Sequence, residues 1–418
     1  MAIEKCNFKT YASGWDDVTS SRAWALDETN LKWNENILSE ATAHDQPLRS
    51  VHTSNLPEVL EQLGITLLVS TYQAGKLVLL RSENGVLNTH FRVFEKPMGL
   101  AVEPNRFAIG TAMQVWEFHN IPAVCARLND PEKFVDPSSE MSTLPPRVKP
   151  PRPHDACFLP RIAHWTGDID IHEMAWLGDD LIFVNTRFSC LAKRSGTFNF
   201  EPVWRPPFIT QYIPGDCCHL NGMATRDGVV RYVTALGETD QPESWRSNKR
   251  DGGLLIDVPS GETIVRGLSM PHSPRWYGGR LYMLHSGTGG FGYVDIATGK
   301  YQSIIELPGF TRGLSFCGPL AFIGLSQVRE SAVFGGVPIA EQALTERNCG
   351  VWVVNIETGQ LVGFVKFEDA VQEIFAVEVL AGSIYPEVVN EDRDLLARTY
   401  ELADDVLQSV PSHLLARV

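Results

Sequence analysis

Short apolar runs, broken by glycine, proline and single polar residues, recur along most of the chain with the two-residue alternation typical of β-strands. Six of these runs share one layout, and each begins a group of strand-like segments. They are residues 97–101, 171–175, 220–224, 271–275, 311–315 and 372–376. Their starts lie 74, 49, 51, 40 and 61 residues apart, which suits four-stranded propeller blades with insertions. The pattern therefore predicts an all-β fold, a six-bladed β-propeller.

The sixth blade is split between the two ends of the chain. The run at 372–376 is followed only by a helical pattern, whereas segments 66–70, 77–80 and 88–94 lack an inner strand. We expect N- and C-terminal strands to pair and close the ring, because closure leaves only short, protected sheet edges.

The pattern divides the chain into three parts. Residues 1–63 predict an N-terminal arm with a short helix at its end, residues 64–385 the propeller, and residues 386–418 a C-terminal helical tail. The proline-rich stretch 120–170 predicts a long, lid-like insertion within the propeller. The tail repeats apolar residues at helical spacing, which leaves open whether it docks on the ring or joins two copies of the chain.

Charge and composition limit the classes of function. The chain has 418 residues and a formal net charge of −14, which disfavours a general nucleic-acid-binding protein. It shows neither a secretory leader pattern nor a run of about 18 apolar residues, so we expect a cytoplasmic protein with no membrane partner. Eight cysteines form no C-x-x-C pattern and are expected to be reduced. The adjacent Cys217 and Cys218 suit a structural pair, with a reactive-thiol role left open.

Aligning the six runs places one residue of each in a common column near the axis of the ring. The column contains Met98, His172, Asn221, His272, Arg312 and Glu373. His219 lies two residues before Asn221 and therefore on the same side of its strand. We expect these polar side chains to converge on the axis.

Three histidines of this group, His172, His219 and His272, come from consecutive blades and predict a transition-metal site. Neutral imidazole ligands that leave coordination positions open describe a catalytic site, and the ligand set favours Fe or Cu, with Zn or Mn as alternatives. Two other interpretations stay open. The histidines can be hydrogen-bonded structural residues, or they can form a metal-free proton-transfer site tuned by Glu373 or Arg312.

Arginine and tryptophan gather in segments expected around the mouth of the ring, which suits a small anionic substrate with a carboxylate or phosphate group. The predicted substrate-binding residues are Arg161, Arg187, Asn221, Trp245 and Arg275. The predicted catalytic residues are His164, Arg312 and Glu373. Structural salt bridges for the arginines and blade packing for the tryptophan are the alternatives.

Several longer segments resemble a family of conserved hypothetical bacterial proteins. These segments are residues 161–173, 184–192, 218–222, 234–240, 245–249, 270–276, 285–289 and 308–314. The resemblance spans residues 60–385; it implies a six-bladed propeller and names no reaction. The architecture is more distantly similar to lactonase- and gluconolactonase-like propellers, which hold an axial calcium ion with Glu, Asn and Asp. The histidines and arginine of this chain depart from that pattern, since calcium prefers oxygen ligands.

These features together predict a metal-dependent enzyme, an oxidoreductase or oxygenase that acts on a small anionic substrate. A metal-assisted lyase or hydrolase at the same site is the first alternative. A non-catalytic propeller that binds a ligand or a protein is the second, because a propeller fold does not specify chemistry.

Overall fold

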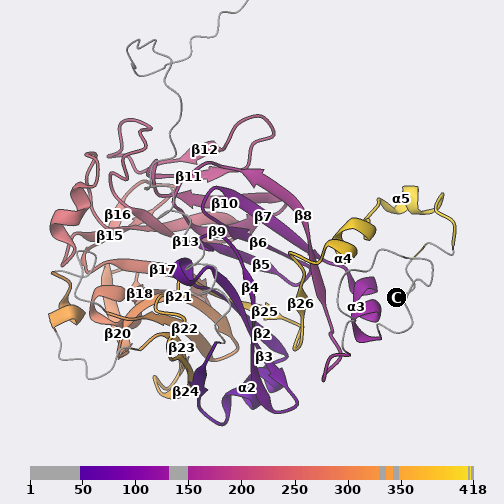
Figure 1. Ribbon diagram of the computed structural model, residues 1–418. Helices are drawn as coiled ribbons and strands as arrows, with labels where there is room; N and C mark the ends of the chain where they lie inside the picture. Colours follow the sequence, from indigo (N-terminus) through magenta and orange to yellow (C-terminus); the bar gives the residue numbers. More distant parts are fainter. Residues whose placement is uncertain (1–47, 131–148, 329–335, 342–347, 413–414, 416–418) are drawn as a thin grey trace, which may run out of the picture. The chain divides into compact units, whose positions relative to one another are not determined.

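The computed structural model describes residues 48–130, 149–328, 336–341, 348–412 and 415. Within these residues six sheets of four or five strands form the blades of a β-propeller (Figure 1). The innermost strands contact one another in the order β5, β9, β13, β17, β21 and β25, and β25 contacts β5. The predicted all-β, six-bladed fold is confirmed.

Blades 1 to 4 follow one another along the chain. Blade 1 contains β5 (Leu100–Glu103), β6 (Arg106–Gly110), β7 (Gln114–Asn120) and β8 (Cys157–Trp165). Blade 2 contains β9 (Ile171–Leu177), β10 (Asp180–Asn185), β11 (Cys190–Lys193) and β12 (Glu201–Trp204). Blade 3 contains β13 (Leu220–Arg226), β14 (Val229–Ala235), β15 (Gly253–Asp257) and β16 (Thr263–Leu268). Blade 4 contains β17 (Pro271–Tyr277), β18 (Arg280–His285), β19 (Gly290–Asp295) and β20 (Lys300–Glu306).

Blades 5 and 6 combine strands from distant parts of the sequence. Blade 5 contains β21 (Phe310–Cys317), β22 (Leu320–Ser326), β23 (Gly350–Asn355), β24 (Leu361–Phe367) and β1 (Ser50–His52). Blade 6 contains β25 (Ala376–Ala381), β2 (Ile65–Ser70), β3 (Lys76–Glu83) and β4 (Val86–Val93). The antiparallel pairing of β25 with β2, which lie side by side in Figure 1, closes the ring as predicted.

Part of the stretch 120–170, expected as an irregular insertion, has regular structure. Helix α3 (Pro122–Asn129) follows β7, and β8 is the fourth strand of blade 1, while residues 131–148 lie outside the described residues. Most of β8 is half-buried or exposed, so the apolar alternation that identifies a buried strand is weak there. The short strand β26 (Glu387–Val388) pairs in parallel with the buried start of β8.

Helices α2, α4 and α5 lie near the ends of the described chain, whereas α3 lies within blade 1. Helix α2 (Leu56–Leu63) starts with a proline in its first turn and buries Leu56 and Leu60, as its sequence predicts. The predicted C-terminal helix is present as two short helices, α4 (Arg393–Arg398) and α5 (Asp404–Leu407). The 3₁₀ helices are Tyr72–Ala74, Ser244–Asn248, Ser286–Thr288 and Pro338–Glu341. No helix in the described ranges is both long and apolar enough to span a bilayer.

Hydrophobic side chains fill the spaces between and within the blades. In blade 1 the fully buried rings of Phe107 and Phe118 stack with centroids 4.7 Å apart, and Phe158 packs 5.4 Å from Phe107. Burying such a side chain stabilises the fold by about 1.5–3 kcal/mol. The packed blades therefore hold the inner strands, and the side chains on them, in fixed positions.

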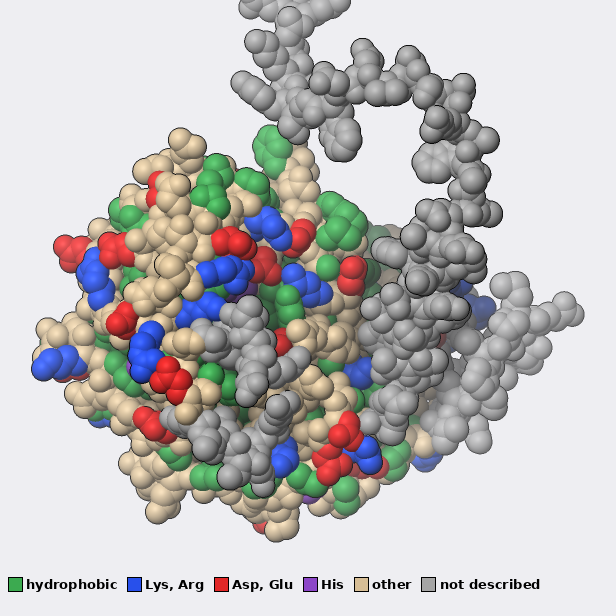
Figure 2. Space-filling model, turned by 60° about the vertical axis from the view of Figure 1, so that its left-hand side comes forward, with side chains coloured by type: hydrophobic (Ala, Val, Ile, Leu, Met, Phe, Trp, Pro, Cys, Tyr) green, Lys and Arg blue, Asp and Glu red, His purple; other side chains and the backbone are tan. Residues whose placement is uncertain are grey.

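Charged side chains of both signs are interspersed over the described surface of the face in Figure 2. Many exposed arginines are paired, for example Arg266 with Glu238 at 2.9 Å and Arg250 with Glu341 at 2.7 Å. Exposed pairs of this kind contribute little to stability.

Candidate functional site

Three inner strands begin one residue before a polar side chain of the predicted column. Strands β9, β13 and β17 start at Ile171, Leu220 and Pro271, so His172, Asn221 and His272 are each the second residue of an inner strand. Arg312 is the third residue of β21. Met98 and Glu373 precede β5 and β25.

The backbone before two of these strands orients the histidine that follows. Asp170 and Met270 have φ angles of 50° and 46°, a left-handed conformation that is uncommon outside glycine. The carbonyl oxygen of Asp170 lies 2.9 Å from Nδ1 of His172, and that of Met270 lies 2.8 Å from Nδ1 of His272. The same local geometry therefore fixes both imidazoles.

In blades 2 and 4 a hydroxyl group just after the second strand also contacts the Nδ1 atom of the histidine. Thr186 Oγ1 lies 2.8 Å from Nδ1 of His172 and donates to the carbonyl of Leu220 in blade 3 at 2.6 Å. Ser286 Oγ lies 3.0 Å from Nδ1 of His272. Because the backbone carbonyls can only accept, each Nδ1 carries the hydrogen and each neutral ring keeps its lone pair on Nε2.

His219 is anchored in a related way by a carboxylate. Its Nδ1 lies 2.9 Å from Asp216 Oδ2, which also accepts from Nε1 of Trp245 at 3.1 Å. The rings of His219 and Trp245 lie 4.4 Å apart. A carboxylate next to Nδ1 again places the hydrogen there and leaves Nε2 available.

His172 is the most confined of the three histidines. Its ring meets that of His219 edge to face at 5.0 Å and that of Phe375 at 5.0 Å. Its Nε2 is buried and has no hydrogen-bond partner in the described part of the chain. Burial lowers the pKa of His172 and that of His272 well below the usual value of 6.5, and the charge of Arg312 lowers both further. Both imidazoles are therefore neutral at neutral pH.

Arg312 brings a positive charge to these histidines. Its guanidinium lies 3.7 Å from the centre of the Phe375 ring, a cation–π geometry. Burial lowers the pKa of Arg312, and Glu373, which is half-buried, opposes that shift. Among the described residues Arg312 has no hydrogen-bonded or ion-paired partner. We call His172, His219, His272 and Arg312 the axial imidazole cluster.

An ion pair borders this cluster. Lys96 Nζ lies 3.1 Å from Asp170 Oδ1, and the ammonium group also lies 5.2 Å from the Tyr72 ring. Burial by itself would raise the pKa of Asp170, but His172, His219 and Lys96 bring it well below its usual range. The carboxylate therefore stays ionised beside the imidazoles.

A second charged group, the axial ion triad, joins three other inner-strand residues. Arg275 on β17 binds Glu173 on β9 at 2.6 Å and Glu378 on β25 at 2.7 Å. These strands belong to blades 4, 2 and 6, which alternate around the ring, so the triad spans the axis. Burial alone would lower the pKa of Arg275, but the two carboxylates raise it. Arg275, predicted to bind substrate, is engaged by these protein carboxylates.

The other predicted substrate-binding residues occupy separate places. Asn221 accepts from Thr234 at 2.7 Å and donates to the carbonyl of Pro271 at 3.0 Å, which ties blade 3 to blade 4. Arg187 pairs with Asp168 at 2.5 Å, at an exposed position. Trp245 packs on His219, as described above, and belongs to the same cluster of side chains.

Two predicted site residues lie on β8, the fourth strand of blade 1 and therefore far from the inner strands. Arg161 binds Glu401 of the C-terminal segment at 2.7 Å. His164 Nε2 lies 2.7 Å from the carbonyl oxygen of Asn199. The structure does not bring these two residues to the axial imidazole cluster.

The adjacent cysteines near His219 are buried. Cys217 and Cys218 are both free thiols, and Ser189 Oγ accepts from their backbone amides at 3.1 and 3.4 Å. Burial raises the pKa of the Cys218 thiol to about 12. At neutral pH it is therefore protonated, and a thiol is far less nucleophilic than a thiolate.

The three imidazoles provide donor atoms for a metal ion, but they are not grouped as a metal site in the described ranges. Three Nε2 lone pairs are suitable donors for a transition metal. In the ranges that the structure describes, however, no three side chains of His, Cys, Asp or Glu are grouped so that they could hold a metal ion. His172 and His219 are in ring contact, whereas His272 packs against Phe310 at 5.5 Å.

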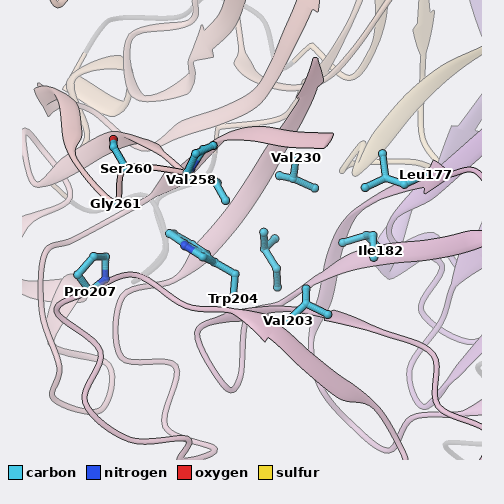
Figure 3. Close-up of a pocket in the computed structure, with 11 residues that line it drawn as sticks. Leu177, Ile182, Val203, Trp204, Pro207, Val230, Val258, Ser260 and Gly261 are labelled. Carbon is cyan, nitrogen blue, oxygen red and sulfur yellow. The ribbon is translucent and has the colours of Figure 1, made fainter. Parts of the chain in front are cut away.

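A pocket that none of the axial residues lines lies at the outer part of blades 2 and 3. It has a volume of about 570 Å³ and is lined mainly by apolar side chains, among them Ile182, Trp204, Val230 and Val258 (Figure 3). No titratable side chain lines it. It therefore offers no side chain for acid–base chemistry.

Sequence reasoning missed the residues that orient the imidazoles. A hydroxyl residue occurs at or just after the second strand of most blades and bonds to a residue in or just before an inner strand. These residues are Ser70, Thr186, Thr234, Ser286 and Ser326. Aligning the second strands, as well as the inner ones, would have revealed this repeat. No repeated sequence pattern pointed to Phe375 or Lys96 as residues next to the imidazoles.

Comparison with known proteins gives a family and distant structural likenesses. Residues 54–389 match the family described as the domain of unknown function DUF4915, which agrees with the resemblance drawn from sequence. No curated protein matches the chain.

Three solved structures are similar to this chain at low identity. A chain of a nidogen/laminin complex is 10% identical, with 76% of this chain and 99% of that chain covered and a TM-score of 0.47. A protein of unknown function from Bacteroides caccae is 8% identical, with 75% and 98% covered and a TM-score of 0.44. The computationally designed Ika8 protein is 11% identical, with 74% and 83% covered and a TM-score of 0.32. At these scores the likenesses carry no argument about function.

Proposed function

Since the chain belongs to the family of the domain of unknown function DUF4915, we propose a function from the chemistry of the axial imidazole cluster. We infer that the protein is an enzyme that binds a small carboxylate- or phosphate-bearing substrate there and transfers a proton on it. The observation that carries this proposal is the buried Nε2 of His172, which has no described hydrogen-bond partner and lies near Arg312, a residue that forms no ion pair with any described residue.

The two unsatisfied groups specify complementary parts of a ligand. A buried acceptor without a donor costs about 1–3 kcal/mol, so Nε2 of His172 calls for an O–H or N–H group. A guanidinium binds carboxylate or phosphate oxygens through two parallel hydrogen bonds. A small hydroxy acid or hydroxylated phosphate ester offers both groups in one molecule.

Substrate binding also adjusts the basicity of the site. Arg312 lowers the pKa of His172 and of His272 through its positive charge. An anion bound to Arg312 offsets that charge, which raises both imidazole pKa values toward the range in which proton transfer is efficient. The substrate would thus activate its own general base.

A transition-metal enzyme is the second candidate, and one observation favours it. All three histidines use Nδ1 for a hydrogen bond to an oxygen atom, an arrangement that orients histidine ligands in metal sites. His172, His219 and His272 are not grouped as metal ligands in the described ranges, so they would have to move together to hold the ion through Nε2. Bound Fe or Cu would supply Lewis-acid or redox chemistry, as in an oxidoreductase or a metal-assisted lyase or hydrolase.

A binding experiment tests the anionic substrate. Glycolate and its uncharged analogue glycolamide are titrated into the wild-type protein, Arg312→Gln and Arg266→Gln, with calorimetry as the measurement. We expect glycolate to bind the wild type and Arg266→Gln equally and Arg312→Gln at least tenfold more weakly. Equal glycolate binding by all three proteins would overturn the proposal.

Two measurements separate the metal-free and metal-dependent candidates. Elemental analysis of natively purified protein and of His172→Ala shows whether stoichiometric Fe or Cu is bound and depends on the histidine. Long-range ¹H–¹⁵N spectra report the tautomer, and we expect the Nδ1–H form for all three histidines. A metal lost in the variant supports the second candidate, whereas a metal-free protein that still binds glycolate supports the first.

We also propose a reducing compartment such as the cytoplasm. The described cysteines are free thiols, and disulfides form mainly in oxidising compartments.

A further inference from the structure

A second pocket lies where blade 6 meets blade 1. It has a volume of about 390 Å³ and lies between the end of β4, the β6–β7 hairpin, the end of β8 and the segment after β26. The side chains that matter for its chemistry are Glu95, Gln114, Trp116, Trp165, Asn390 and Glu391.

The register of blade 1 places the aromatic and amide side chains on one face. Gln114 on β7 lies opposite Trp165 on β8, and Trp116 is two residues from Gln114. Side chains two residues apart on a strand share a face. Gln114, Trp116 and Trp165 therefore form one wall of the pocket.

No described lysine or arginine covers the two tryptophan rings of this wall, unlike the rings of three other tryptophans of the propeller. Arg106, Arg246 and Arg226 cover the rings of Trp176, Trp245 and Trp276 at 3.9, 4.4 and 4.1 Å. No lysine or arginine of the described residues lies over Trp116 or Trp165, and Trp165 is 54% exposed.

Two carboxylates and one amide add acceptor oxygens to the pocket. Glu95 and Glu391 form no ion pair with any residue in the described ranges, and no Lys, Arg or His lines the pocket. Asn390 donates from Nδ2 to the carbonyl of Val93 at 2.9 Å, which fixes its orientation. Its Oδ1 is buried and has no partner among the described residues.

We propose that this pocket binds a small organic ammonium ion that carries at least one N–H group. The tryptophan faces attract a cation, the two carboxylates balance its charge, and Asn390 Oδ1 accepts its hydrogen. A quaternary ammonium ion would leave that buried oxygen unsatisfied, at a cost in affinity. The site is independent of the proposed function at the axis.

Titration of the full-length protein with n-butylammonium, tetramethylammonium and glucose, followed by calorimetry and ligand-observed NMR, tests this inference. We expect n-butylammonium to bind more tightly than tetramethylammonium, and glucose not to bind. Trp165→Ala should weaken n-butylammonium binding about twofold to fivefold, as expected for a cation–π contact at an exposed site. Replacing both Glu95 and Glu391 with glutamine should weaken it about tenfold, roughly 1.4 kcal/mol.

The matched control replaces two carboxylates elsewhere, Glu262→Gln and Glu357→Gln, and should leave binding unchanged. Arg312→Gln should also leave it unchanged, which separates this site from the axial one. Equal weakening by the control pair would show non-specific charge attraction and overturn the proposal. Binding of glucose without n-butylammonium, or equal binding of the two ammonium ions, would overturn the recognition of an N–H cation.

Discussion

The axial imidazole cluster and the axial ion triad are carried by the inner strands of the same ring, yet their polar groups are satisfied in opposite ways. In the triad Arg275 binds two carboxylates, and Ser315 donates to Glu378 at 3.1 Å. In the cluster neither His172 Nε2 nor the guanidinium of Arg312 has a hydrogen-bond or ion-pair partner among the described residues, although the guanidinium packs on the Phe375 ring. Buried charges that are paired fix how the blades meet, whereas polar groups without a hydrogen-bond or ion-pair partner are available to bind a ligand.

The strongest test of this contrast removes the centre of the triad. Arg275→Met leaves Glu173 and Glu378 buried together without a cation, and breaking a buried ion pair costs about 3–5 kcal/mol. We expect that decrease in the free energy of unfolding, measured by urea denaturation at pH 7.5. Arg266→Met, which removes an exposed pair with Glu238, should change it by less than about 1 kcal/mol. Equal effects would contradict a structural role for the triad.

Thr186 provides the next largest expected effect, because it links the cluster to the neighbouring blade. Thr186→Val keeps the shape but removes the donor to the buried carbonyl of Leu220. An unsatisfied buried acceptor costs about 1–3 kcal/mol, which urea denaturation would detect. Thr263→Val, a similar change at a half-buried position of β16, serves as the control and should have little effect.

The pH dependence of stability separates the two groups further. His172 and His272 have folded-state pKa values well below 6.5, so below pH 6.5 the unfolded chain binds more protons than the folded chain. The free energy of unfolding should therefore be highest above pH 6.5 and fall below it, by up to about 1.4 kcal/mol per pH unit for each histidine.

Urea denaturation between pH 5.5 and 7.5 measures this slope. Other histidines also contribute to this slope. The contribution of His272 is therefore the difference between the slope of the wild type and that of His272→Gln. A smaller slope in the variant is expected. An identical slope would mean that His272 binds its proton equally well in the folded and the unfolded protein, which contradicts a lowered pKa.

Ser286→Ala should have the smallest effect. It removes one of two oxygens near Nδ1 of His272, and the carbonyl of Met270 still accepts the hydrogen. We expect a loss of about 0.5–1 kcal/mol in the free energy of unfolding and no change of tautomer in ¹H–¹⁵N spectra. A loss as large as that of Thr186→Val would show that Ser286 does more than support one imidazole.

Much of the ring could be predicted from sequence because it depends on local periodicity. The repeated runs located the inner strands, and the incomplete patterns at both ends predicted the closure of blade 6. The second-residue positions of His172, Asn221 and His272 follow from the same register. These features need only the alternation of strand side chains.

The partners of the charged residues could not be predicted, because they depend on which blades face one another across the ring. Arg275 and its carboxylates are more than 100 residues apart in sequence. The anchoring of the histidines also depends on left-handed backbone at Asp170 and Met270, which neither residue type favours strongly. Strand β8 escaped recognition because its outer position removes the apolar alternation.

The pairing of β25 with β2 means that the ring is completed only after the strands of all the other blades have been synthesised. Strands β2 to β4 emerge early and keep an unpaired edge until residues 376–381 follow, and such edges invite aggregation while they are exposed. A chain that stops before Ala376 lacks both the inner strand of blade 6 and Glu378. A chain truncated there therefore cannot close the ring or form the axial ion triad. Its open strand edge makes it a target for chaperones and proteases.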